Sequence, residues 1–188
     1  MLVAFIGVPC SGKTSTAARV FADLKDAGYP AEFLPEYART YIANRRLSKD
    51  ISPLNDNDQA CIMYQQLVSE EMMTTSSPDS IIIADSAALN ALIYMTPEFQ
   101  NQPKIQENAR KITSRYSVIF RCHPVHPGST YDINRVHNFE QSLALDTKVE
   151  PLLYSFGLTW IDLHGEQKHR AIRAYGAVLE EMVKEVAR

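Results

Sequence analysis

The sequence feature that most constrains the fold is a short loop between an apolar run and an amphipathic segment. Residues 2–6 are all apolar, which is typical of a buried strand, and the chain then turns at Gly7. From Lys13 onward the apolar residues recur at helical spacing, and Gly28 is well placed to end that helix. A strand, a glycine-bounded loop and a helix in this order predict the first unit of an α/β sheet.

The loop reads Gly7-Val8-Pro9-Cys10-Ser11-Gly12-Lys13-Thr14, which fits the pattern G-x-x-x-x-G-K-[ST] without a mismatch. Glycines let the backbone N–H groups wrap a phosphate, and the start of the helix adds its positive end. Lys13 supplies a charge for the β- and γ-phosphates, and the Thr14 hydroxyl is suited to ligate magnesium. The pattern predicts an ATP and Mg²⁺ site with contacts from Gly7, Pro9, Cys10, Ser11, Gly12, Lys13, Thr14 and Ser15.

The rest of the chain alternates between strand-like and helical patterns. Further strands are predicted at 31–34, 80–84, 116–121 and 158–163. Helices are predicted at 36–46, 58–73, 87–94, 104–115, 136–154 and 168–186, the second of these capped by Asp58. This alternation predicts one α/β domain over residues 1–188, with a parallel sheet covered on both faces and a lid at about 122–136.

Composition and charge narrow the function. The 188 residues are 45% hydrophobic and 22% charged, as in ordinary globular domains, and the net charge of -3 argues against nonspecific coating of nucleic acid. Three cysteines without a CxxC spacing argue against a disulfide scaffold and favour a reducing cytosol. No apolar segment approaches the length of a membrane span, so we expect a soluble, cytoplasmic protein.

Charged residues at the predicted strand ends are candidates for catalysis, because ligands of parallel sheets gather there. Glu36 is placed to accept a proton from a substrate hydroxyl, and Arg39 to hold a substrate phosphate or to pair with Glu36. Asp85 has three possible roles: it holds magnesium, acts as the base itself, or caps the next helix. Glu36 and Asp85 are therefore both candidates for the general base.

Arginines around the predicted lid are candidates for stabilising the charge that develops during phosphoryl transfer. Arg135 is the first choice for this catalytic role, oriented by Asp132, and Arg121 is a candidate substrate ligand. On the predicted helix 58–73, Gln65 is a candidate for reading an acceptor, and Gln66 beside it shares this chemistry, because an amide can pair with a base or carboxamide edge.

Two further patterns have alternative interpretations. Cys122, His123 and His126 contain metal-ligand side chains, although an ordinary loop is the simpler interpretation. The run Asp162-Leu163-His164-Gly165 matches the D-x-x-G of GTPases but follows the last strand, too late for that role. We expect the loop there to pack against an adenine instead.

On these residues the chain resembles the P-loop nucleoside and nucleotide kinases. It is most similar to the ribosylnicotinamide-kinase-type ATPase domain of bacterial NAD-biosynthesis regulators and their phage-encoded relatives. The segments that carry the resemblance are 7–14, Pro35-Glu36-Tyr37-Ala38-Arg39, the strand ending in Asp85, Asp132-Ile133-Asn134-Arg135, and 157–163 with Arg170 after it. The resemblance implies the three-layer P-loop NTPase fold with strand order 2-3-1-4-5. It also implies that Glu36 and Arg39 face the acceptor and that Arg135 lies in a lid. Ser86 and Ile133 depart from the group, which often has threonine and glycine there.

Three functions fit these features. The first is an ATP-dependent kinase acting on a hydroxyl or phosphate of a nucleoside-like or nucleotide small molecule. The second is a kinase acting on a nucleic acid, because the basic stretch 104–121 holds five cations against Glu107 alone. These cations are Lys104, Arg110, Lys111, Arg115 and Arg121. The third is a nucleotide-dependent switch or assembly ATPase. The acceptor, the oligomeric state and a cellular or viral origin do not follow from the sequence.

Overall fold

The computed structural model describes residues 1–125 and 138–187, and five strands within them form one parallel sheet. The strands are β1 (Leu2–Ile6), β2 (Ala31–Leu34), β3 (Ile81–Ala84), β4 (Val118–Cys122) and β5 (Ile161–Leu163). Their order across the sheet is β2-β3-β1-β4-β5. This confirms the predicted fold class and strand order, including the crossover that separates β1 from β2.

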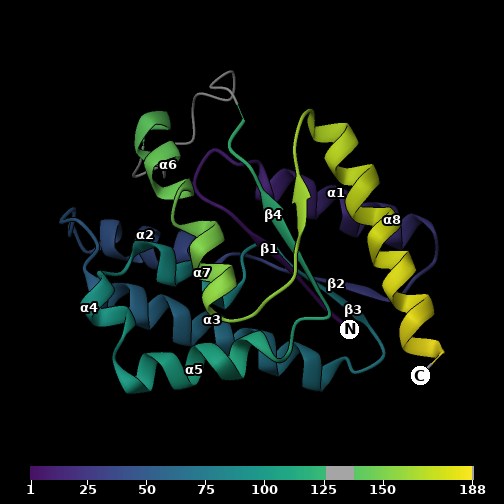
Figure 1. The fold of residues 1–188 in the computed structure, drawn as a ribbon, viewed down its shortest axis with the longest axis horizontal. Helices are drawn as coiled ribbons and strands as arrows, with labels where there is room; N and C mark the ends of the chain where they lie inside the picture. Colours follow the sequence, from purple (N-terminus) through teal and green to yellow (C-terminus); the bar gives the residue numbers. More distant parts are fainter. Residues whose placement is uncertain (126–137, 188) are drawn as a thin grey trace.

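Helices cover both faces of this sheet (Figure 1). One face carries α1 (Lys13–Asp26) and α8 (Gln167–Val186), which pack against each other. The helices on or beside the opposite face are α2 (Tyr37–Leu47), α3 (Asp56–Ser76), the 3₁₀ helix η1 (Ala88–Tyr94), α4 (Pro97–Gln100), α5 (Pro103–Thr113), α6 (Phe139–Asp146) and α7 (Val149–Ser155). In the described part of the chain, none of the helices is long and apolar enough to cross a membrane.

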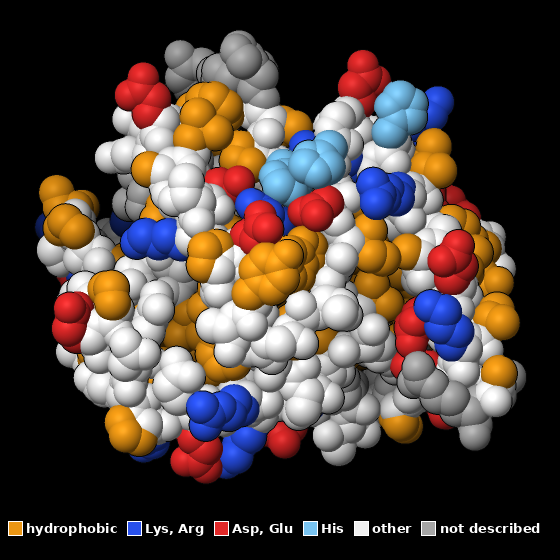
Figure 2. Space-filling view, in the orientation of Figure 1, with side chains coloured by type: hydrophobic (Ala, Val, Ile, Leu, Met, Phe, Trp, Pro, Cys, Tyr) orange, Lys and Arg blue, Asp and Glu red, His pale blue; other side chains and the backbone are white. Residues whose placement is uncertain are grey.

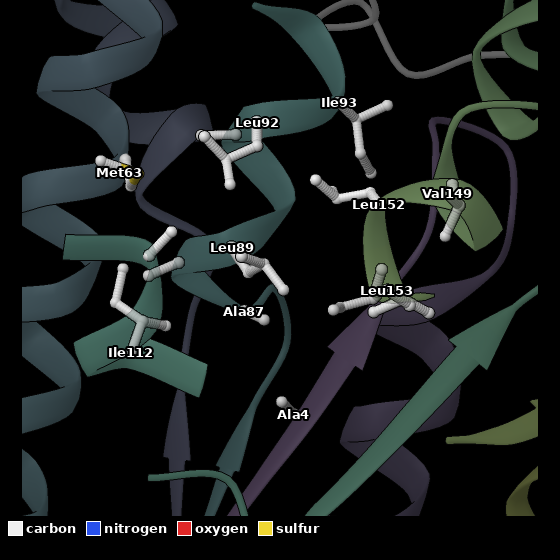
Figure 3. Packing of buried hydrophobic residues seen from close by; sticks show 14 of the residues in the cluster. Ala4, Met63, Ala87, Leu89, Leu92, Ile93, Ile112, Val149, Leu152 and Leu153 are labelled. Carbon is white, nitrogen blue, oxygen red and sulfur yellow. The ribbon is translucent and has the colours of Figure 1, made fainter. Parts of the chain in front are cut away.

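The two faces divide the buried strand residues between two cores, because successive side chains point to opposite sides of a strand. Ala4 joins the core beneath α3, η1 and α7, where it packs with Leu89 and Leu153 (Figure 3). Phe5 and Phe120 join the core beneath α1 and α8, with their ring centroids 5.0 Å apart. Double-sided burial explains why β1 reads as an unbroken apolar run in the sequence.

Two predicted helix details were wrong, and the helix predicted at 87–94 is present. The predicted helix 136–154 is interrupted, because its described part forms the two helices α6 and α7. Pro151 lies in the first turn of α7, where the backbone N–H that proline lacks would have no partner within the helix. The cap of α3 is Asn55 rather than Asp58, because Asn55 accepts the amide of Asp58 at 3.1 Å while the Asp58 carboxylate accepts the amide of Asn55 at 2.8 Å. The helix after Asp85 is a 3₁₀ helix.

A buried carboxylate joins this 3₁₀ helix to α3. Glu70 accepts the backbone N–H of Ala88 at 2.8 Å and the hydroxyl of Tyr116 at 3.2 Å. Burial raises the pKa of Glu70 to about 7 from 4.5, although these two hydrogen bonds act in the opposite direction. The carboxylate thus satisfies the start of η1 at the cost of holding a charge inside the protein.

We predict that Glu70→Gln weakens the pH dependence of stability. The folded protein holds the Glu70 proton more tightly than the unfolded chain, so the free energy of unfolding falls as the pH rises from about 4.5 to about 7. The glutamine oxygen still accepts the Ala88 amide but carries no charge, so the variant gains up to about 3 kcal/mol on the wild type across this range. Urea unfolding at pH 5 and pH 7.5 measures the difference, with the exposed Glu71→Gln as control. An equal difference at both pH values would contradict the assignment.

Candidate functional site

The loop between β1 and α1, which we call the phosphate loop (residues 7–14), lies at the carboxyl edge of the sheet and needs its two glycines. Gly7 has a φ of 156°, and a Cβ there would lie 2.5 Å from the carbonyl oxygen of Cys122. Gly12 has a φ of 73°, a left-handed conformation that is costly for other residues. The first glycine therefore allows close packing against β4, and the second allows the turn into α1.

Two buried side chains from distant parts of the chain hold the phosphate loop. The Oδ1 of Asn90, in η1, accepts the N–H of Gly7 at 3.0 Å. Arg170, in α8, donates to the carbonyl of Ser11 at 2.7 Å and to that of His123 at 2.9 Å. Because both anchors are buried, the protein core positions the backbone of the loop.

The side chains that open α1 are arranged around the loop. Lys13 is only 8% exposed, and its Nζ donates to the carbonyls of Gly7 at 2.8 Å and Val8 at 3.2 Å. The Thr14 hydroxyl accepts a long hydrogen bond of 3.5 Å from Nη2 of Arg39. The lysine ammonium thus lies against the loop, where two backbone carbonyls hold it.

Asp85, at the end of β3, faces these residues from the neighbouring strand. It is 2% exposed, and burial raises its pKa, with a contribution from Glu36, while the charge of Lys13 and a hydrogen bond with Thr14 lower it. Its Oδ1 is buried and has no hydrogen-bond partner among the described residues. The first amide of η1 is accepted by Glu70, so a capping role does not occupy Asp85. A carboxylate with an unused buried oxygen beside a threonine hydroxyl fits the ligands that Mg²⁺ prefers.

A cavity of about 340 Å³ opens between the phosphate loop and helices α2 and α3. It is lined by the loop from Val8 onward, by Glu36 and Arg39 at the start of α2, and by Gln59 and Tyr94. Arg39 Nε lies 3.4 Å from Glu36 Oε2, so the predicted pair forms at the edge of the cavity. Its volume is in the range typical of small-molecule sites.

A smaller cavity of about 30 Å³ shares Glu36, Gln59 and Tyr94 with the larger one. Gln66 lines it and accepts the backbone N–H of Tyr37 at 2.8 Å. The Nε2 of Gln66 is buried and has no partner among the described residues, so it can still donate a hydrogen bond. The structure therefore places Gln66 and Gln59 at the cavity, whereas Gln65 is exposed on another side of α3.

Of the two arginines predicted to act around the lid, the structure places Arg121 away from this cavity and does not describe Arg135. Arg121 is 7% exposed and faces acidic side chains of α6 and α7, with Glu150 at 2.9 Å and Asp146 at 3.3 Å. It does not line the cavity. Arg135, together with Asp132, Ile133 and His126, lies outside the described residues.

The five cations of the basic stretch 104–121 lie in different environments. Lys111 pairs with Glu107 at 3.0 Å, and Arg115 donates to the Thr74 hydroxyl at 2.9 Å. Arg121 is buried in the acidic contacts described above, so exposed cations remain mainly along α5. Figure 1 places α5 along the lower edge of the molecule, away from the carboxyl ends of the strands. The five cations therefore do not form one surface.

Several site residues were missed by sequence reasoning. Asn90 lies within the otherwise apolar run Ala88-Leu89-Asn90-Ala91-Leu92. This isolated polar residue is a signal from which a buried hydrogen-bond partner could have been predicted. Gln59 and Tyr94 have no local signal, because they reach the cavity only when α3 and η1 pack together. None of Cys10, Cys61 and Cys122 forms a disulfide bond in the structure.

Comparisons with known proteins agree with this architecture. NadR in complex with NR superposes with a TM-score of 0.69 at 21% sequence identity, over 96% of this chain and 51% of that chain. Deoxyadenosine kinase from M. mycoides, with products dCMP and dCDP bound, gives 0.62 at 13% identity, over 98% and 100% of the two chains. A gluconokinase from Sinorhizobium meliloti 1021 gives 0.53 at 16% identity, over 100% and 97%. This chain spans about half the length of the NadR chain. At these identities the comparisons describe the fold alone.

Among curated proteins, no sequence matches significantly. A protein-family model described as an AAA domain matches residues 2–170, which is most of the chain. That match contains the phosphate loop, Glu36, Asp85 and Arg170. The chain therefore belongs to this AAA domain family, and its fold is that of the P-loop nucleoside and nucleotide kinases.

Proposed function

We propose that this protein is an ATP-dependent kinase that transfers the γ-phosphate to a hydroxyl or phosphate of a nucleoside-like or nucleotide small molecule. The observation that carries the proposal is the cavity in which the phosphate loop faces Glu36 and Arg39. A phosphate-binding loop alone serves many NTPases. A neighbouring cavity with a carboxylate and an arginine adds what an acceptor needs, namely a group to orient or deprotonate it and a cation to hold it.

The residues of the site divide into two groups. Lys13 and the amides of the phosphate loop would hold the transferred phosphates, and Thr14 and Asp85 would hold Mg²⁺, whose chemistry is to neutralise charge on the phosphate oxygens. On the opposite wall, Glu36 would accept the proton of the acceptor hydroxyl. Arg39 contacts both Glu36 and Thr14, so its guanidinium is placed between the two groups.

The acceptor wall favours a ligand with hydrogen-bonding edges and a flat apolar surface. Gln66 retains an unused buried donor, Gln59 is 7% exposed, and Tyr94 lines both cavities. An amide and a phenol ring together suit a heterocyclic base, because amides pair with base edges and aromatic rings pack on base faces. A nucleoside-like acceptor agrees with these features better than a polymer does, since the exposed cations of α5 lie away from the cavity.

An ATP-consumption screen with Mg²⁺ tests the proposal. The acceptors are nucleosides, nicotinamide riboside, nucleoside monophosphates, and DNA and RNA oligonucleotides. We expect a small nucleoside-like compound or nucleotide to stimulate turnover. Stimulation by oligonucleotides alone would favour a nucleic-acid kinase, and slow turnover that no acceptor stimulates would favour a switch or assembly ATPase. The catalytic role of Arg135, stabilising the charge that develops during phosphoryl transfer, stays a prediction.

We predict that Lys13→Ala lowers kcat by several orders of magnitude, because it removes the charge that faces the transferred group. The matched control is Lys25→Ala, an exposed lysine in the last turn of the same helix. Steady-state kinetics with the acceptor found in the screen measure the effect. Wild-type turnover in Lys13→Ala would show that the phosphate loop is wrongly assigned.

We predict that Glu36→Gln lowers the rate of transfer by about 10²–10⁴-fold, the range expected for a lost general base, while ATP binding stays near that of the wild type. Asp85→Asn, in contrast, should raise the Mg²⁺ concentration needed for half-maximal rate, because it weakens a magnesium ligand. Single-turnover rates across a Mg²⁺ titration separate the two effects. If Asp85→Asn abolishes transfer at saturating Mg²⁺ and Glu36→Gln does not, the base is Asp85.

A further inference from the structure

A second group of metal-ligand side chains lies where β4 and β5 end, outside the proposed kinase site. Arg121 is the register partner of Asp162, so His123 and His164 leave the ends of the two strands side by side. Their imidazole rings stack with centroids 3.8 Å apart and an interplanar angle of 21°. One ligand atom from each of His123, Asp162 and His164 lies within 4.8 Å of the other two. Figure 2 shows the two adjoining histidines in pale blue next to acidic and basic side chains.

The charges around these three residues favour a cation. Arg121 is the cation that contacts the local carboxylates, with Glu150 at 2.9 Å, Asp146 at 3.3 Å and Asp162 at 3.9 Å. With neutral imidazoles, three carboxylates against the guanidiniums of Arg121 and Arg170 leave a local charge of about -1, which favours a cation. In addition, Asp146 Oδ1 is buried and has no hydrogen-bond partner among the described residues.

The orientation of His123 also matches a metal ligand. Its Nε2 lies 2.7 Å from Asp162 Oδ1, and its Nδ1 lies 3.9 Å from Asp146 Oδ2. In many metal sites one ring nitrogen binds the ion while the other points to a carboxylate that fixes the ring. His123 has Nε2 toward the ligand cluster and Nδ1 on the side of Asp146, at a distance that a small turn of the ring would shorten to a hydrogen bond.

We propose that His123, Asp162 and His164 bind a borderline divalent transition-metal ion such as Zn²⁺, with Asp146 orienting His123. Two imidazoles and a carboxylate are a donor set that Zn²⁺ accepts and that Mg²⁺ does not prefer. Metal–ligand distances of about 2.0–2.2 Å require ligand atoms about 3.4 Å apart. The exposed His164 side chain closes the site by turning inward, and a neutral His123 then carries its one ring proton on Nδ1, the side that faces Asp146, which leaves Nε2 free to bind the ion.

Titration of the untagged full chain with Zn²⁺ tests the proposal, by calorimetry without nucleotide and in millimolar Mg²⁺ to occupy oxygen-ligand sites. We expect one saturable Zn²⁺ site. Asp162→Asn and His164→Ala should each weaken it by roughly 10–100-fold or more, because direct ligands matter at least as much as the groups that orient them. The control is His169→Ala, an exposed histidine of α8 that lies outside the cluster.

The single tryptophan reports on the same place. Trp160 Nε1 donates to Asp162 Oδ2 at 3.3 Å, so Cu²⁺ bound at the cluster should quench its fluorescence in the wild type and in His169→Ala, but much less in His164→Ala. Zn²⁺ should also raise the Tm of the wild type and not that of His164→Ala. Since His164 is exposed, its substitution leaves the fold intact, which the Tm without metal checks.

Two results would overturn the proposal. If Zn²⁺ does not bind saturably, or binds His164→Ala as tightly as the wild type, the three residues form only a hydrogen-bonded cluster in which His123 contacts Asp162. If Cys10→Ser removes the binding while His164→Ala retains it, the ion occupies the phosphate loop instead. Neither result bears on the proposed kinase activity, which the acceptor screen tests by itself.

Discussion

The functional edge of the sheet depends on a buried guanidinium. Arg170 is 2% exposed and donates three hydrogen bonds to backbone carbonyls, those of Ser11, His123 and Gly165. These carbonyls belong to the phosphate loop, to the segment after β4 and to the loop after β5. A buried charge is tolerated only when its donors are satisfied, so Arg170 stabilises one relative arrangement of all three loops and would destabilise others.

The candidate kinase site follows from that arrangement and from the parallel sheet. All five strands present their carboxyl ends at one edge, which brings Lys13, Glu36 and Asp85 together from segments far apart in the sequence. Burial then gives these residues different properties, because Asp85 lies in the interior with its pKa raised while Glu36 lies at the wall of an open cavity. We assign magnesium to Asp85 because its buried Oδ1 has no partner among the described residues and Thr14 lies beside it, and we assign the acceptor proton to Glu36 because Glu36 lines the cavity.

The two buried arginines show how little residue type says about role. Arg121 lies in β4 and Arg170 in α8, and both are less than one-tenth exposed. Arg170 contacts carbonyl groups and retains its positive charge as a structural tie, whereas Arg121 contacts three carboxylates, which together outweigh it. The first arrangement organises the phosphate loop. The carboxylates around Arg121 make the environment of His123 and His164 acidic, and the proposed metal site rests on this environment.

The sequence by itself determined the α/β class and the phosphate loop, because both depend on local patterns, whereas the strand order was predicted from the family resemblance. Buried strands such as β1 need continuous apolar residues, and the loop needs Gly7 because a Cβ there would lie 2.5 Å from the Cys122 carbonyl oxygen. Only the tertiary structure decided which polar side chains share a site. Gln65 and Gln66 are neighbours in the sequence, yet they lie on different sides of α3. Because of the way α3 packs on the sheet, Gln65 is exposed and Gln66 lines the smaller cavity. Likewise, the register of β4 and β5 places His123 against His164 across 41 residues, a distance over which sequence spacing carries no geometric information.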